Sequence, residues 1–126
     1  MSPYDLITKV GEELGRKYLD SIIKTVNGRA YAIVITKPES GGNPYSLLNR
    51  SDFAEEEWEY LNRLYNNQYV FDLVVYECAD GKVVGRGENF YGISYLLEDA
   101  EVIINSCEAK VFNQGVVKQQ ILNSDW

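Results

Sequence analysis

The sequence contains no histidine, and this absence excludes several classes of chemistry. Histidine is the usual general base near neutral pH and the commonest metal ligand in proteins. Without it, neither a Ser-His-Asp nor a Cys-His catalytic arrangement can be built. No other catalytic motif stands out. The sequence therefore predicts a non-enzymatic protein with no catalytic residue, no metal site and no cofactor.

Cysteines and long apolar runs are also scarce. Cys78 and Cys107 are the only cysteines, and their wide separation predicts two reduced thiols rather than a disulfide. The N-terminal segment lacks the basic and apolar regions of a secretory signal. The longest apolar run covers residues 30–35, which is far too short to cross a bilayer. We therefore expect a cytoplasmic protein that does not enter membranes.

The chain is acidic, with a net charge of -7 over 126 residues. The excess is concentrated in residues 38–110, which hold fourteen acidic and five basic side chains. Residues 1–37 are slightly basic. A negative field of this kind repels nucleic acid and attracts basic surfaces. Direct nucleic-acid binding is therefore not expected, whereas a basic protein partner is.

The length and the apolar periodicity predict one α+β domain over residues 1–126. Apolar residues recur with helical spacing in three segments and form strand-like runs in three others. The sheet is expected to be small, mainly antiparallel and of about three to five strands, with an N-terminal helix and two further helices packed on it. The expected helices cover 3–26, 52–66 and 93–106, and the expected strands cover 29–37, 69–78 and 82–91.

Two segments carry clear local signals. Ser2 and Pro3 fit the start of the first helix, and Asn27-Gly28 fits its end. The strand over 29–37 is apolar on both faces, which predicts a central strand covered on both sides.

The second pair of strands flanks Asp80-Gly81, which predicts a hairpin with a two-residue turn. This register would place Tyr76 opposite Gly85. Beyond residue 107 the pattern fits either two short strands or one broken helix.

A short acid-x-lysine pattern occurs at Glu108 with Lys110 and at Asp80 with Lys82, and Asp72 can serve as a separate acid. Two carboxylates and a lysine can hold a magnesium ion and orient a water molecule without histidine. A small metal-dependent nuclease-like enzyme is therefore one alternative function. The pattern is short enough to arise by chance, and the sequence lacks the basic groove expected of a nuclease.

The acidic side chains cluster at the start of the second expected helix and on the outer face of the third. Together with tyrosines, which are enriched at protein interfaces, they suit docking on a basic protein. We therefore expect a binding module, in its most concrete form an inhibitor of the immunity or anti-defence type that occludes a basic surface of its partner. The candidate partner-binding residues are Asp52, Glu55, Glu56, Glu57, Glu59, Glu98, Asp99, Glu101, Tyr45 and Tyr60.

A structural or scaffold subunit is the other alternative. The connection between the first strand and the second helix carries apolar residues at 45–48, and Gly11 and Gly15 lie one helical turn apart. Small residues at this spacing allow close approach of another element. These two features predict the contacts of a homo-oligomer.

Overall fold

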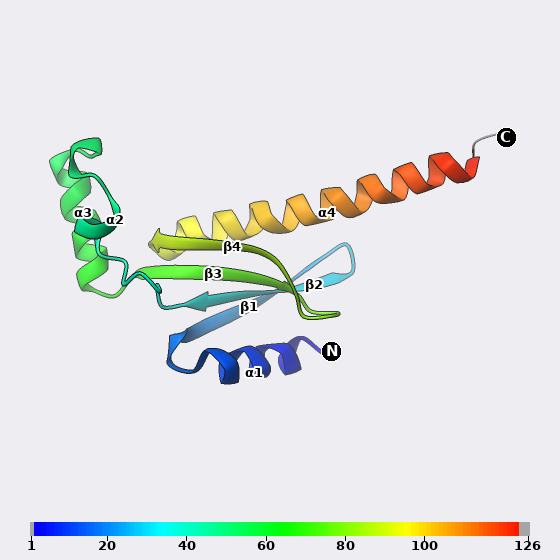
Figure 1. Ribbon diagram of the computed structural model, residues 1–126, viewed down its shortest axis with the longest axis horizontal. Helices are drawn as coiled ribbons and strands as arrows, with labels where there is room; N and C mark the ends of the chain where they lie inside the picture. Colours follow the sequence, from blue (N-terminus) through cyan, green and yellow to red (C-terminus); the bar gives the residue numbers. More distant parts are fainter. Residues whose placement is uncertain (1, 124–126) are drawn as a thin grey trace.

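The computed structural model describes the backbone of residues 2–123 and the side chains of residues 2–15 and 17–112. Its α+β fold contains one antiparallel sheet of four strands in the order β1-β2-β3-β4, which confirms the predicted class. Helix α1 covers one face of the sheet, helix α4 covers the other, and helix α3 stands at one end (Figure 1). The elements are α1 (Pro3–Leu14), the 3-10 turn η1 (Gly15–Lys17), β1 (Tyr18–Val26), β2 (Arg29–Thr36), α2 (Pro44–Leu47), the 3-10 turn η2 (Arg50–Asp52), α3 (Glu55–Asn66), β3 (Val70–Glu77), β4 (Lys82–Tyr91) and α4 (Ile93–Asn123).

The N-terminal helix is shorter than predicted. It begins as expected, because the Ser2 hydroxyl accepts a hydrogen bond from the Asp5 amide at 3.2 Å. It ends at Gly15, whose φ of 54° lies in the left-handed region that favours glycine. The expectation of one helix over 3–26 is therefore wrong beyond residue 14.

Residues 18–26 form strand β1, which pairs antiparallel with β2. Ile22 and Val26 are spaced by four and so mimic a helical face, but the segment is rich in β-branched residues, which favour strands. Asn27 and Gly28 do not end a helix. They have φ values of 51° and 79° and form the two-residue turn between β1 and β2, for which Asn-Gly is a preferred pair.

Strand β2 lies in the middle of the sheet and is covered on both faces, as its sequence predicts. On one face Tyr31, Ile33 and Ile35 join the core under α4. On the other face Ala32 and Val34 join the core under α1. A strand buried on both sides reads as an unbroken apolar run, which explains why this prediction succeeded.

The hairpin of β3 and β4 is confirmed, but its turn is longer than predicted. Glu77 pairs with Lys82, so the connecting loop has four residues, 78–81, rather than the two residues Asp80-Gly81. The Asp80 carboxylate accepts a hydrogen bond from the Lys82 amide at 2.9 Å and stabilises this loop.

The longer loop shifts the register of the hairpin. Tyr76 lies opposite Val83 and not opposite Gly85, which pairs with Val75 instead. A Cβ atom at Gly85 would lie 2.5 Å from Cγ2 of Ile103 in α4. The glycine therefore makes room for the helix above the sheet, rather than for a side chain on the neighbouring strand.

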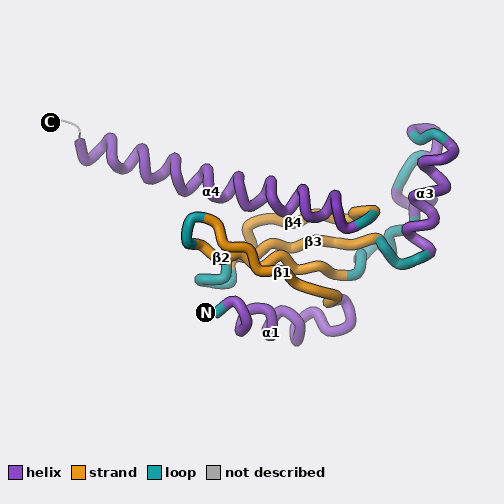
Figure 2. The backbone as a smooth tube through the Cα atoms, turned by 180° about the vertical axis from the view of Figure 1, so that it is seen from behind, coloured by secondary structure: helices purple, strands orange, loops and turns teal. Residues whose placement is uncertain are grey.

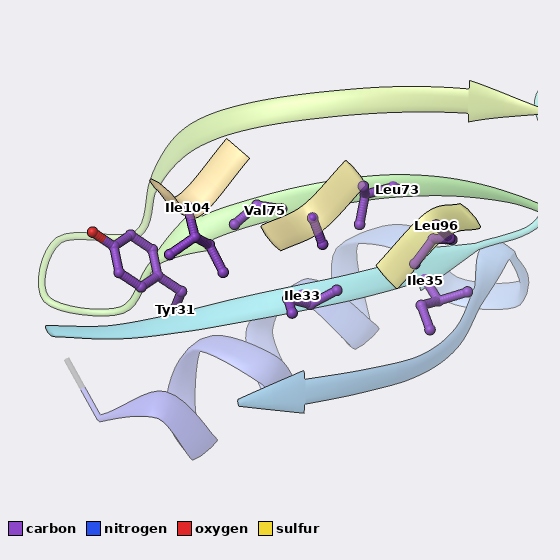
Figure 3. Packing of buried hydrophobic residues seen from close by; sticks show 8 residues of the cluster. Tyr31, Ile33, Ile35, Leu73, Val75, Leu96 and Ile104 are labelled. Carbon is purple, nitrogen blue, oxygen red and sulfur yellow. The ribbon is translucent and has the colours of Figure 1, made fainter. Parts of the chain in front are cut away.

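Helix α4 is one uninterrupted helix of 31 residues, so neither two strands nor a broken helix follows residue 107. It crosses one face of the sheet and continues beyond it (Figure 2). Its buried residues Leu96, Ala100 and Ile104 complete the larger core. Leu96 packs near Ile35, and Ile104 packs at the opposite end, near Tyr31 (Figure 3).

Candidate functional site

Most of the predicted site residues lie on α3 and on the connection that precedes it. The helix begins at Glu55, three residues later than predicted, because Asp52 belongs to the separate turn η2. Ala54 occupies the N-cap position and makes no side-chain hydrogen bond. The three glutamates of the first turn lie instead at the positive end of the helix dipole, where negative charge stabilises a helix.

Trp58 is the centre of an aromatic cluster at this end of the molecule. Trp58 is only 3% exposed, and Tyr45 of α2 packs edge-on against it with ring centroids 5.2 Å apart. The centroid of the Phe53 ring lies 5.9 Å from that of the Trp58 ring. The apolar part of the connection between β2 and α3 thus packs on α3, while the Tyr45 ring stays 67% exposed. The buried Trp58 ring thus fixes the position of an exposed tyrosine ring.

The carboxylates at this end are exposed. Among the described side chains, none of the acidic residues of η2 and α3 forms an ion pair. Their charge is therefore not compensated by an ion pair with a described side chain. The exposed acidic residues are Asp52, Glu55, Glu56, Glu57 and Glu59.

The acidic residues of α4 do not share one outer face. Asp99 is half-buried over β4. A Cβ atom added to Gly87 of β4 would lie 3.1 Å from Oδ2 of Asp99. Glu101 lies 3.9 Å from the Lys24 ammonium group of β1, at the other side of the sheet. Glu98 is exposed. The acidic surface is thus carried mainly by α3.

A cleft of about 350 Å³ opens between α3 and the junction of β4 with α4. It contains two predicted site residues, Glu57 and Tyr60. Five of its eight lining residues are aromatic, and Glu57 is the only charged one among them. The lining residues are Phe53, Glu57, Tyr60, Leu61, Asn89, Phe90, Tyr91 and Tyr95.

The β4 wall of this cleft is held by hydrogen bonds. The Tyr91 hydroxyl donates to the Gly42 carbonyl at 2.7 Å, and burial raises the pKa of Tyr91. Asn89 has a φ of 56°, and its backbone N–H donates a hydrogen bond to the buried Asp72 carboxylate at 2.9 Å. The Ser40 hydroxyl donates to the Asn89 side chain at 2.8 Å. These bonds fix the positions of Asn89 and Tyr91.

Sequence reasoning missed most of the aromatic lining. Tyr91 and Tyr95 stand on either side of Gly92, whose φ of 94° turns the chain from β4 into α4. This strand-to-helix junction was predictable, and it groups the two tyrosines. Their approach to Tyr60 depends on how α3 packs against β4, and no local pattern reports that packing.

A second cluster of charged groups lies where α4 meets the start of β2. The Arg29 guanidinium donates to the Glu108 carboxylate, with Nη2 2.8 Å and Nε 3.2 Å from Oε2. The Tyr31 hydroxyl donates to the other carboxylate oxygen at 3.1 Å. The hydrogen bonds from Arg29 are the main reason that the pKa of Glu108 is lowered, and burial raises the pKa of Tyr31. Because Arg29 and Tyr31 belong to β2 and Glu108 belongs to α4, these hydrogen bonds connect the helix to the sheet.

This cluster predicts that stability falls in acid. Because the pKa of Glu108 is lower in the folded state, its contribution is complete above the ordinary carboxyl value of 4.5 and is lost as the pH falls through the folded value. Urea unfolding of the wild type and of Glu108→Gln should show a clear difference in stability at pH 7 that shrinks at pH 3. An equal difference at both pH values would contradict this role.

The acids of the acid-x-lysine patterns have structural partners. Glu108 binds Arg29, and Asp80 holds the hairpin loop. Asp72 accepts hydrogen bonds from the amides of Glu39 and Asn89. Within the described part of the chain, no group of three or more cysteine or acidic residues is placed to hold a metal ion.

Of the features that predict a homo-oligomer, Gly11 faces a residue of the same chain. A Cβ at Gly11 would lie 3.8 Å from the Tyr18 ring, and Gly15 ends α1.

Both cysteines are free, as predicted. Cys78 is buried, and this burial raises the pKa of its thiol, whereas Cys107 is partly exposed.

Comparison of the chain with protein families, with curated proteins and with solved structures finds no match. Among the described residues, no helix is both long and apolar enough to span a bilayer.

Proposed function

We propose that this protein is a non-enzymatic binding module that docks on a basic surface of a partner protein through α3 and the tyrosines beside it. The observation that carries the proposal is the state of the α3 carboxylates, which are exposed and unpaired among the described side chains. Helix α3 also stands at the end of the sheet rather than over either face (Figure 1). A partner can therefore reach it without rearranging the core.

Electrostatics supports a basic partner. The chain carries a net charge of -7, and four glutamates are concentrated within five positions of α3. Such a field steers a positively charged protein into the encounter complex and repels acidic competitors. Since these carboxylates have no described cationic partner, binding would not break an internal ion pair.

The tyrosines supply the contact area that charge alone does not. Tyr45 is 67% exposed and Tyr60 is 52% exposed, and both lie near the acidic turn of α3. Tyrosine gives a large amphipathic surface at a small cost in side-chain entropy. Tyr45 is already held against Trp58, so less freedom is lost when it meets a partner.

In its most specific form, the proposal is an inhibitor of the immunity or anti-defence type, acting in the cytoplasm. A basic active site or nucleic-acid-binding surface presents arginine and lysine side chains arranged for phosphates. Closely spaced carboxylates on one helix can occupy those side chains in place of phosphates. Binding would then block the partner's own ligand.

A matched pair of charge reversals tests the proposal. The double variant Glu55→Lys/Glu59→Lys reverses two exposed carboxylates on α3, and Glu12→Lys/Glu13→Lys makes the same change in net charge on α1. Each immobilised variant is incubated with an extract of the source cells, and the retained basic proteins are quantified. Circular dichroism melting verifies that both variants are folded.

We expect the wild type and the α1 variant to retain the same basic protein, and the α3 variant to retain about tenfold less of it. Retention should also fall as the salt concentration rises, because exposed charges are screened. Equal retention by the two variants, or no basic protein retained by the wild type, would overturn the proposal.

A further inference from the structure

The cleft between α3 and the β4-α4 junction has the chemistry of a cation site. Aromatic faces carry partial negative charge and attract ammonium and guanidinium groups. Here the rings line a cleft of about 350 Å³ together with the carboxylate of Glu57. No lysine or arginine is among its described lining residues, so no cation of the lining competes with a ligand for the Glu57 carboxylate.

We infer that this cleft binds an arginine side chain of the partner protein. The inference rests on the proposed function and names the contact at its centre. Arginine suits the cleft better than lysine, because its flat guanidinium group can stack on an aromatic ring while its edge donates two hydrogen bonds to a carboxylate. The apolar stem of arginine can pack against Leu61 at the wall.

The cleft is partly pre-formed, which lowers the cost of binding. Tyr91 is held by Gly42, and Asn89 is held by Asp72 and Ser40. Tyr60 and Tyr95 remain 52% and 66% exposed at the entrance. An inserted side chain would cover both rings, which are otherwise left in water. Walls that are already ordered lose little conformational entropy when a ligand arrives.

Three capped pentapeptides test the ligand. Each carries one central residue between glycines, namely arginine, citrulline or lysine. Citrulline has nearly the shape of arginine but no charge, so it isolates the contribution of the cation. Binding is followed by amide chemical shifts in two-dimensional NMR spectra of the full chain.

The arginine peptide should shift the amide signals of residues 57–61 and 89–95 and should bind at least about fivefold more tightly than the citrulline peptide. Lysine should bind more weakly than arginine. Equal affinities for arginine and citrulline, equal affinities for arginine and lysine, or shifts confined to other segments would overturn the inference.

Two neighbouring glutamates supply the matched variants. Glu57 lines the cleft, whereas its exposed neighbour Glu56 does not. Glu57→Gln removes the charge with little change in size, and it should weaken arginine binding about fivefold to tenfold. Glu56→Gln makes the same change in net charge and should alter binding less than about twofold. Equal effects of the two variants would show that the general field, and not the cleft, attracts arginine.

The two proposals fail in different ways. If the peptides show no preference for arginine while the α3 charge reversal still abolishes capture of the basic protein, the cleft is wrong and the docking surface stands. If the charge reversal leaves capture unchanged, the proposed function is wrong whatever the peptides show.

Discussion

Replacing Ile104 by alanine is expected to lower the free energy of unfolding by about 2–5 kcal/mol. Ile104 is fully buried between α4 and the sheet, where it belongs to one core cluster with Tyr31 and Val75 (Figure 3). Truncation removes buried apolar surface and leaves a cavity that the rigid sheet cannot close. Denaturation in urea, followed by circular dichroism, measures the loss.

Val102 provides the control for this experiment. It lies on the same helix but is 60% exposed, so Val102→Ala should change the stability by less than about 0.5 kcal/mol. If Ile104→Ala were no more destabilising than Val102→Ala, α4 would not pack on the sheet by the face described.

Adding a methyl group at Gly85 should also be costly, by about 1–3 kcal/mol. The new Cβ of Gly85→Ala would lie 2.5 Å from Cγ2 of Ile103 and 3.0 Å from its Cγ1. Because Ile103 is branched at Cβ, it cannot move aside by rotating only the end of its side chain. Strand β4 and helix α4 must therefore separate, and thermal unfolding should shift to lower temperature.

A double variant distinguishes this clash from a general loss of strand stability. Ile103→Ala removes the atoms that the new methyl group would meet. The combination Gly85→Ala/Ile103→Ala should therefore be more stable than the sum of the two single losses predicts. Strictly additive losses would show that the close approach of Ile103 is not the cause.

The central strand and the second hairpin were predictable, because each carries a strong local pattern. The strand β2 is apolar on both faces, and the hairpin contains Asp80-Gly81. The hairpin register was not predictable from the turn alone. The loop has four residues, and the pairing shifts again between Val75 and Tyr76. Space for Ile103 at Gly85 depends on a helix that follows later in the chain.

The largest error concerns residues 18–26, which form a strand instead of continuing the first helix. Apolar residues spaced by four are compatible with either element over such a short stretch. Two signals favoured the strand, namely the Asn27-Gly28 pair that follows β-branched residues and Gly15 as a helix end. The Asn-Gly pair is the stronger signal, because it matches the twist of a two-residue hairpin.

The candidate site could be predicted only in part. The acidic turn of α3 and Tyr60 are visible in the sequence as a charged, aromatic helix start. The cleft is not visible, because its lining comes from α3, from the end of β4 and from Tyr95 in α4. Asp99 and Glu101 follow Glu98 closely in sequence, yet they lie against β4 and near β1, respectively. Such placements arise from packing between distant segments.

The central proposal is that a basic ligand binds at α3 and the β4-α4 junction. The decisive measurement is an NMR titration of the full chain with an octa-arginine peptide at low salt. We predict that the shifted amide signals concentrate in residues 52–61 and 89–98 and that the acidic pair Glu12 and Glu13 on α1 is little affected. Shifts spread evenly over all exposed carboxylates, or centred away from α3, would contradict the account.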